Sequence, residues 1–126
     1  MESLKDLKIV VADDSKLIRD VVGRAFSKVD GLKVVGQAEN GIEALELVRE
    51  HNPHVLVLDI SMPLKDGIEV LEELRAAGST TVIVIFTADS SPFAKKACLD
   101  FGANYYLDKS QISQLIEICS LHLLAL

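Results

Sequence analysis

Five residues with reactive or metal-binding side chains stand at equivalent places in the sequence, each following a short apolar run. Asp13 and Asp14 follow the first run and Asp59 the third, whereas Thr87 follows the fourth and Lys109 the fifth. Three carboxylates held side by side repel one another, and a hard divalent cation relieves that repulsion. An all-oxygen ligand set suits Mg²⁺, or Mn²⁺, better than Zn²⁺.

A lysine and a hydroxyl beside such a metal would contact the remaining oxygens of a phosphoryl group. The set therefore indicates a site that accepts a phosphoryl group on a carboxylate. Taken alone, the Asp13-Asp14 pair fits helix capping as well as it fits metal binding, and a lone Thr or Lys after a strand is more often structural. The occurrence of all five residues at matching places favours chemistry.

The elements that must bring these residues together alternate along the chain. Several strand-like runs are apolar at consecutive positions, which is typical of parallel strands covered by helices on both faces. The segments between them carry apolar residues every three or four positions and predict five helices. This pattern predicts a doubly wound three-layer α/β fold, in which the carboxyl ends of the strands share one edge of the sheet. The predicted strands are 8–12, 33–38, 55–58, 82–86 and 105–107.

Local signals mark where the helices begin. Ser15 and Ser91 are expected N-caps, and Pro92 is expected at the first position of its helix. Gly41 and Gly67 are expected to serve turn or helix-start geometry rather than ligand binding.

Length and composition exclude several classes of protein. The chain has 126 residues, which fits a single domain spanning 1–126, and 49% of them are apolar, enough for a core. A net charge of −6 argues against nonspecific nucleic-acid binding and against docking on an anionic membrane. No stretch approaches the roughly 18 apolar residues of a membrane helix, and the charged N-terminus lacks the apolar core of a secretory signal. We therefore expect a soluble, cytoplasmic protein.

The cysteines and histidines have ordinary interpretations. Cys98 and Cys119 lie in apolar helical stretches without a paired spacing, so we expect reduced core thiols. His51 and His54 are expected in a solvated loop before the third strand, away from the acids. No histidine, His122 included, is positioned as a phosphodonor, so the phosphate must come from another molecule.

Five segments of the chain form a recognisable set: VVADDS (10–15), AENGIEALELV (38–48), VLVLDISMPLKDGIEVL (55–71), VIVIFTA (82–88) and GANYYLDK (102–109). In this order and spacing they resemble the receiver domain of response regulators in two-component signalling, and the match covers 7–124. The resemblance implies a flavodoxin-like fold with a five-stranded parallel sheet of order 2-1-3-4-5.

The resemblance also implies roles for the residues around the acids. Asp59 matches the phosphoacceptor, and Asp13 and Asp14 match the pair that holds Mg²⁺, with the main-chain carbonyl of Ser61 as a further ligand. Ser61 and Asp89 match the variable positions that influence how long the phosphate survives.

Three further positions match the family's switching residues. Thr87 matches the switch hydroxyl, Lys109 the lysine that pairs with phosphoryl oxygens, and Tyr106 the aromatic residue that couples phosphorylation to a distant surface. In one departure, Ser110 follows Lys109 where the family usually has a proline joined by a cis bond. A non-proline cis bond costs about 3 kcal/mol, so a trans bond and a strained cis bond are both open here.

The function implied is a phosphorylation-controlled switch rather than an enzyme with its own substrate. A histidine kinase or phosphotransfer protein would supply the phosphoryl group. The surface of the fourth helix, fifth strand and fifth helix would then act on an unknown downstream protein or form a homodimer. One alternative is an Mg²⁺-dependent phosphohydrolase with an aspartyl-phosphate intermediate, although those enzymes typically carry Asp-x-Asp on the first strand. A degenerate receiver that only binds partners is another, and flavin binding is weaker still.

The last predicted helix carries more apolar residues than one core-facing stripe needs. Leu121, Leu124 and Leu126 project away from that stripe, and fraying of the chain end competes with self-association as the explanation. No output domain is visible in the sequence, so a stand-alone receiver and a piece of a longer protein are both open. The stripe consists of Ile112, Leu115, Ile116, Cys119 and Leu123.

Overall fold

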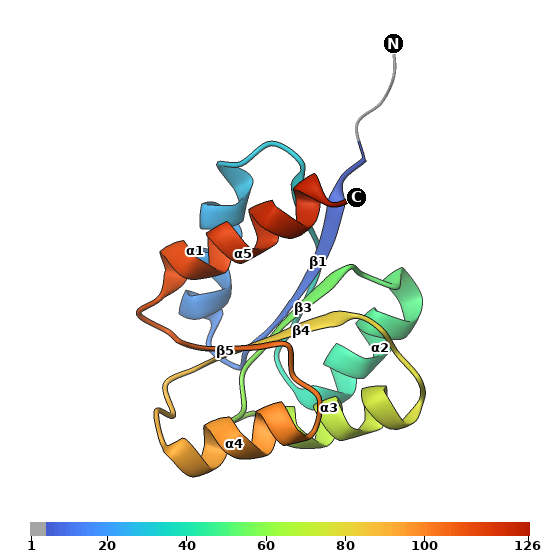
Figure 1. The fold of residues 1–126 in the computed structure, drawn as a ribbon, viewed down its shortest axis with the longest axis vertical. Helices are drawn as coiled ribbons and strands as arrows, with labels where there is room; N and C mark the ends of the chain where they lie inside the picture. Colours follow the sequence, from blue (N-terminus) through green and yellow to red (C-terminus); the bar gives the residue numbers. More distant parts are fainter. Residues whose placement is uncertain (1–4) are drawn as a thin grey trace.

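The computed structural model describes residues 5–126, in which five strands and five helices alternate (Figure 1). The strands are β1 (Leu7–Ala12), β2 (Leu32–Ala38), β3 (Val55–Leu58), β4 (Val82–Thr87) and β5 (Tyr105–Asp108). The helices are α1 (Lys16–Ser27), α2 (Gly41–His51), α3 (Gly67–Ala76), α4 (Pro92–Asp100) and α5 (Ile112–Leu124).

The strands form one parallel sheet in the order β2-β1-β3-β4-β5, which confirms the predicted topology. Each predicted strand is present, with bounds that differ by at most one residue at either end. Thr87 is the last residue of β4 rather than the residue after it, and it pairs in register with Asp108.

The helices cover the sheet on both faces, with α1 and α5 on one side and α2, α3 and α4 on the other (Figure 1). Alternate residues of each inner strand therefore enter two separate cores. In β1, Ile9 and Val11 pack with Phe26 of α1, whereas Val10 packs with Leu71 of α3. This two-sided burial explains why the inner strands are apolar at consecutive positions.

The predicted helix starts are confirmed. The Ser15 hydroxyl accepts a hydrogen bond from the Ile18 amide at 3.3 Å, and the Ser91 hydroxyl accepts one from the Ala94 amide at 3.1 Å. Pro92 opens α4, where its missing amide proton costs nothing.

The loop interpretation was wrong for His51 and right for His54, although His54 is only partly exposed. His51 is the last residue of α2, not a loop residue. His54 does lie before β3, but it is half-buried, and its Nδ1 accepts a hydrogen bond from the Lys8 amide at 2.8 Å. Because Lys8 also accepts from the His54 amide at 2.9 Å, His54 extends the pairing between β1 and β3 by one step.

Helix α4 is present, but most of its apolar residues do not reach the core. Cys98 alone is buried in α4, and Phe93 is 87% exposed. Both cysteines are free and buried, as expected for core thiols, and burial raises the pKa of Cys98 to about 11 and of Cys119 to about 12.

Within residues 5–126, no helix is long and apolar enough to cross a membrane. The same part of the chain contains no cis peptide, so the Lys109–Ser110 bond is trans. The expectation about a leader concerns the N-terminus, of which residues 1–4 lie outside the described residues.

Candidate functional site

The sheet itself places the two buried acids of the site. The hydrogen-bonding ladder continues one residue past β1 and β3, because the Asp13 amide donates to the Ala38 carbonyl and the Asp59 amide to the Ala12 carbonyl, both at 3.0 Å. Asp13 and Asp59 therefore stand in neighbouring positions at the carboxyl edge of the sheet, and both are buried. The carboxyl ends of β4 and β5, where Thr87 and Lys109 stand, lie along the same edge of the sheet.

The three acids meet as predicted. One carboxylate oxygen from each of Asp13, Asp14 and Asp59 lies within 4.8 Å of the other two. Lys109 reaches this cluster from beyond β5: its Nζ is 2.9 Å from Asp13 Oδ2 and 3.1 Å from Asp59 Oδ2. Asp14 is exposed, so it forms the solvent-facing side of the cluster of three acids.

The electrostatics of the cluster favour a cation. Burial raises the pKa of Asp13 above its ordinary value, and the nearby charge of Asp59 adds to this, although hydrogen bonds from Lys109 and Ser15 act in the opposite direction. Burial alone would lower the pKa of Lys109, but its hydrogen bonds with Asp13 and Asp59 raise the pKa overall. The cluster thus holds three carboxylates but one ammonium group, which contacts only Asp13 and Asp59. This all-oxygen set fits a divalent cation such as Mg²⁺.

The loop between β3 and α3 fixes the main chain at Asp59. A Cβ added to Gly67 would stand 2.1 Å from the Asp59 carbonyl oxygen, so only glycine fits there. The Gly67 amide donates to the Ile60 carbonyl at 2.8 Å, and Asp66 caps α3 in a reciprocal pair with Glu69. The predicted helix-start role of Gly67 is confirmed, and the close approach explains it.

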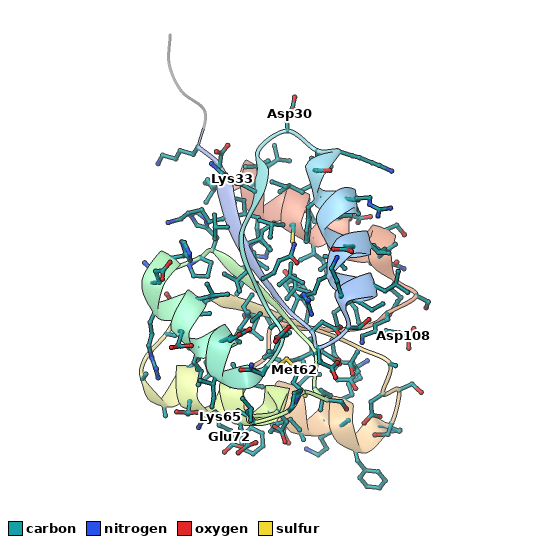
Figure 2. The ribbon with its side chains drawn as sticks, turned by 180° about the vertical axis from the view of Figure 1, so that it is seen from behind. Asp30, Lys33, Met62, Lys65, Glu72 and Asp108 are labelled. Carbon is teal, nitrogen blue, oxygen red and sulfur yellow. The ribbon has the colours of Figure 1, made fainter. Side chains whose placement is uncertain are left out.

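The same loop supplies the other predicted ligand. Ser61 lines a cavity of about 450 Å³ together with Asp14 and Asp66. Figure 2 shows Met62 of this loop in the lower half of the molecule, away from Asp30 and Lys33 at the upper end. Ser61 therefore lies beside the acids, and the ligand role of its carbonyl stays a prediction.

Thr87 and Tyr106 converge on the loop between β4 and α4. Thr87 is buried, and its hydroxyl accepts a hydrogen bond from the Asp89 amide at 3.4 Å. The Tyr106 hydroxyl donates to the Asp89 carbonyl, so both side chains hold the same residue. Burial, with the charge of Asp89, raises the pKa of Tyr106 to about 12, so the hydroxyl keeps its proton. Lys109 joins this group through its amide, which donates to the Thr87 carbonyl at 3.0 Å.

Two features of the site were missed by the sequence analysis. The capping pair Asp66 and Glu69 carries a readable signal, an acid followed three residues later by Glu. Arg19 of α1 carries none: its Nη1 donates to the Asp13 carbonyl at 2.8 Å, a contact that depends on how α1 leaves the sheet.

The chain is thus a doubly wound α/β domain with three acids and a lysine gathered at the carboxyl edge of its sheet. A sequence model described as the response regulator receiver domain matches residues 9–120, and the chain belongs to that family. The resemblance seen in the sequence motifs is thereby confirmed.

Relatives agree with this assignment. The response regulator MprA of Mycobacterium sp. (strain KMS) is 39% identical over 103 residues, which cover 82% of this chain and 44% of that protein. A protein-glutamate methylesterase/protein-glutamine glutaminase of Treponema denticola is 34% identical over 88% of this chain and 30% of its own length. The chain thus spans less than half the length of these curated relatives.

A solved structure gives the same result for the fold. The receiver domain of response regulator 1452 of Francisella has a TM-score of 0.86 and 34% sequence identity, covering 94% of this chain and 97% of that one.

Proposed function

We propose that this receiver domain is a phosphorylation-controlled signalling switch in which Asp59 accepts the phosphoryl group. The observation that carries the proposal is the position of Lys109, whose ammonium lies within 3.1 Å of the carboxylates of both Asp13 and Asp59. A buried carboxylate beside a lysine and two further acids is the arrangement that phosphoryl transfer to an acid requires.

The metal of the site would be Mg²⁺, or Mn²⁺, held by the carboxylates of Asp13, Asp14 and Asp59 and the main-chain carbonyl of Ser61. When bound, the ion neutralises charge on the reacting oxygens. The fit is supported by the 4.8 Å cluster of carboxylate oxygens and by the absence of nitrogen or sulfur ligands in that cluster.

In the transfer step, an oxygen of the Asp59 carboxylate attacks the phosphorus of a phosphohistidine on a histidine kinase or phosphotransfer protein. The new P–O bond forms as the P–N bond to the imidazole breaks, and the imidazole leaves with the electron pair. Lys109, which contacts the carboxylates of Asp13 and Asp59 in the structure, would pair with one of the phosphoryl oxygens, and Thr87 would offer its hydroxyl to another. The product is an acyl phosphate on Asp59.

The output follows from the added charge of about −1.5 to −2. Thr87 moves towards the phosphoryl group, the loop that carries Asp89 follows, and Tyr106 is linked to that loop by its hydroxyl. The face built from α4, β5 and α5 changes as a result and controls a downstream partner. These events would take place in the cytoplasm.

A phosphohydrolase is the alternative with an enzymatic outcome. The first-strand acids Asp13 and Asp14 are adjacent rather than separated by one residue, which speaks against it. The name of the Treponema relative does not carry over, since this chain covers 30% of that protein.

The test is direct phosphorylation with acetyl phosphate and Mg²⁺, followed by intact mass. We expect one added phosphoryl group in the unchanged protein and none in Asp59→Asn. Asp30→Asn is the matched control, because Asp30 is exposed and lies at the opposite end of the molecule (Figure 2). An undiminished adduct in Asp59→Asn would exclude Asp59 as the acceptor.

A further inference from the structure

The turn between β1 and α1 is held at three points around Asp13. The Asp13 amide donates to the Ala38 carbonyl at 3.0 Å, and Asp13 Oδ1 accepts from the Ser15 amide at 2.9 Å. The third point is the Asp13 carbonyl, which accepts from Arg19 Nη1 at 2.8 Å. Lys109 also contacts the Asp13 carboxylate, but among the contacts described Arg19 is the one side chain that holds the main chain of this turn.

The exposed acid of the cluster depends on this turn. No hydrogen-bond donor among residues 5–126 reaches the Asp14 carboxylate, yet it lies within 4.8 Å of the other two carboxylates. Its position is therefore set by the main chain that joins it to Asp13. The peptide group between the two acids contains the carbonyl that Arg19 holds, so a rotation of that group would swing the Asp14 carboxylate away from the cluster.

Arg19 is itself well fixed. Its side chain is 13% exposed, and its Nη2 lies 4.0 Å from Glu39 Oε2 in the loop after β2. The Glu39 amide in turn donates to Glu43 Oε1 at 3.0 Å, at the start of α2. The guanidinium therefore links α1, the β1–α1 turn and the β2–α2 loop, a geometry suited to its planar set of donors.

We propose that Arg19 is a positioning residue for the divalent cation: it orients the Asp13–Asp14 peptide so that both carboxylates face the ion. The inference rests on the proposed function, because it assumes that the acidic cluster binds Mg²⁺. Residues that hold metal ligands in place typically change metal affinity about 10- to 100-fold when they are replaced. Arg19 acts on the main chain of a ligand rather than on its carboxylate, so we expect the lower end of this range.

The direction in which Mg²⁺ affinity changes when Arg19 is replaced distinguishes a positioning role from a purely electrostatic effect of its charge. Arg19 is a cation near a cation site, so losing its charge alone would strengthen Mg²⁺ binding by removing repulsion. A positioning role has the opposite consequence, because the loosened turn lets Asp14 move away. The same substitution thus gives weaker binding under one explanation and tighter binding under the other.

The experiment titrates Mg²⁺ alone into the protein by calorimetry. We expect Arg19→Met to bind Mg²⁺ roughly tenfold more weakly and Arg19→Lys, which can still donate to the Asp13 carbonyl, to recover most of that loss. Arg24→Met is the matched control, since Arg24 is an exposed arginine of the same helix, and its affinity should equal or exceed that of the unchanged protein. Thermal melting without Mg²⁺ verifies that each variant is folded, and Arg19→Gln replaces Arg19→Met should the latter not fold.

Phosphorylation by acetyl phosphate provides the second measurement. A defect in ion positioning is overcome by saturating Mg²⁺, so the rate for Arg19→Met should return to within about twofold of the unchanged protein. Unchanged or tighter Mg²⁺ binding by a folded Arg19→Met protein overturns the inference and leaves the proposed function standing. Failure of the unchanged protein to bind Mg²⁺ would instead overturn the metal site of the proposed function.

Discussion

Replacement of Gly67 by alanine is expected to displace Asp59, the proposed phosphoacceptor. An added Cβ would stand 2.1 Å from the Asp59 carbonyl oxygen and 2.9 Å from the carbonyl carbon of the same residue. Both contacts are with main chain, which cannot rotate away as a flexible side chain would. The β3–α3 loop and the main chain at Asp59 must therefore separate.

The size of that movement follows from the same distance. Ordinary contact with a Cβ begins at 3.4 Å, so an approach of 2.1 Å must open by about 1.3 Å. A misplacement of about 1 Å in a reacting group costs on the order of 100-fold in rate. Overpacking of this kind also lowers the free energy of unfolding by about 1–3 kcal/mol. We therefore expect Gly67→Ala to fold with a lower melting temperature and to be phosphorylated roughly 100-fold more slowly.

The assay compares initial rates of acetyl phosphate labelling at saturating Mg²⁺ with thermal melting of the same samples. Gly102→Ala is the control, because Gly102 has a φ of +103°, which strains any other residue. Gly102 lies between α4 and β5, at the amino end of β5, whereas Asp59 lies at the carboxyl edge of the sheet. It should lose stability without losing the rate of labelling. A Gly67→Ala protein labelled within about twofold of the unchanged rate would refute the reasoning that this glycine sets the position of Asp59.

Three further predictions concern the metal, pH and self-association. Asp14→Ala should reduce Mg²⁺ affinity at least about tenfold in a calorimetric titration, because few protein ligands hold the ion; unchanged affinity would place the ion elsewhere. Burial, and then the charges of Lys8 and Lys5, lower the pKa of His54 below its ordinary 6.5, so the unfolded chain binds a proton more readily. The stability that His54 contributes is therefore complete above about pH 6.5 and is lost as the pH falls towards the folded-state pKa. When the pH is lowered from about 7.5 to about 5, the melting temperature of His54→Gln should fall less than that of the unchanged protein. An equal fall in both proteins would contradict this. Leu121 is 59% exposed on α5, so it could contribute to a contact between two copies of the chain. In sedimentation, beryllium fluoride, a mimic of the phosphoryl group, should strengthen self-association of the unchanged protein but not of Leu121→Glu. A monomer under every condition would exclude self-association.

The order and type of the elements could be predicted from the sequence because they depend on local patterns. Consecutive apolar residues in 55–58 and 82–86 indicated strands buried on both faces, and β3 and β4 are buried in that way. Ser15 and Ser91 marked helix starts because a cap bonds to an amide three residues away, an interaction contained within one short segment.

Much of the candidate site was also predictable, since parallel strands bring their carboxyl ends to one edge whatever the details of packing. That rule alone placed Asp13, Asp59 and Lys109 together, and the structure shows Lys109 in contact with both acids. The chemical roles of these residues stay predictions that the phosphorylation experiments test.

Other features depend on the angles and distances at which the packed elements meet. The exposure of Phe93 shows this, because an apolar residue at helical spacing does not reveal whether its side of α4 faces the sheet. His54 pairs with the main chain of Lys8, 46 residues away, once β1 and β3 lie side by side. The contact of Arg19 with the Asp13 carbonyl requires the direction in which α1 leaves the sheet. Periodicity and capping are properties of a few neighbouring residues, whereas these contacts arise from packing across the whole domain, so only the tertiary structure decides them.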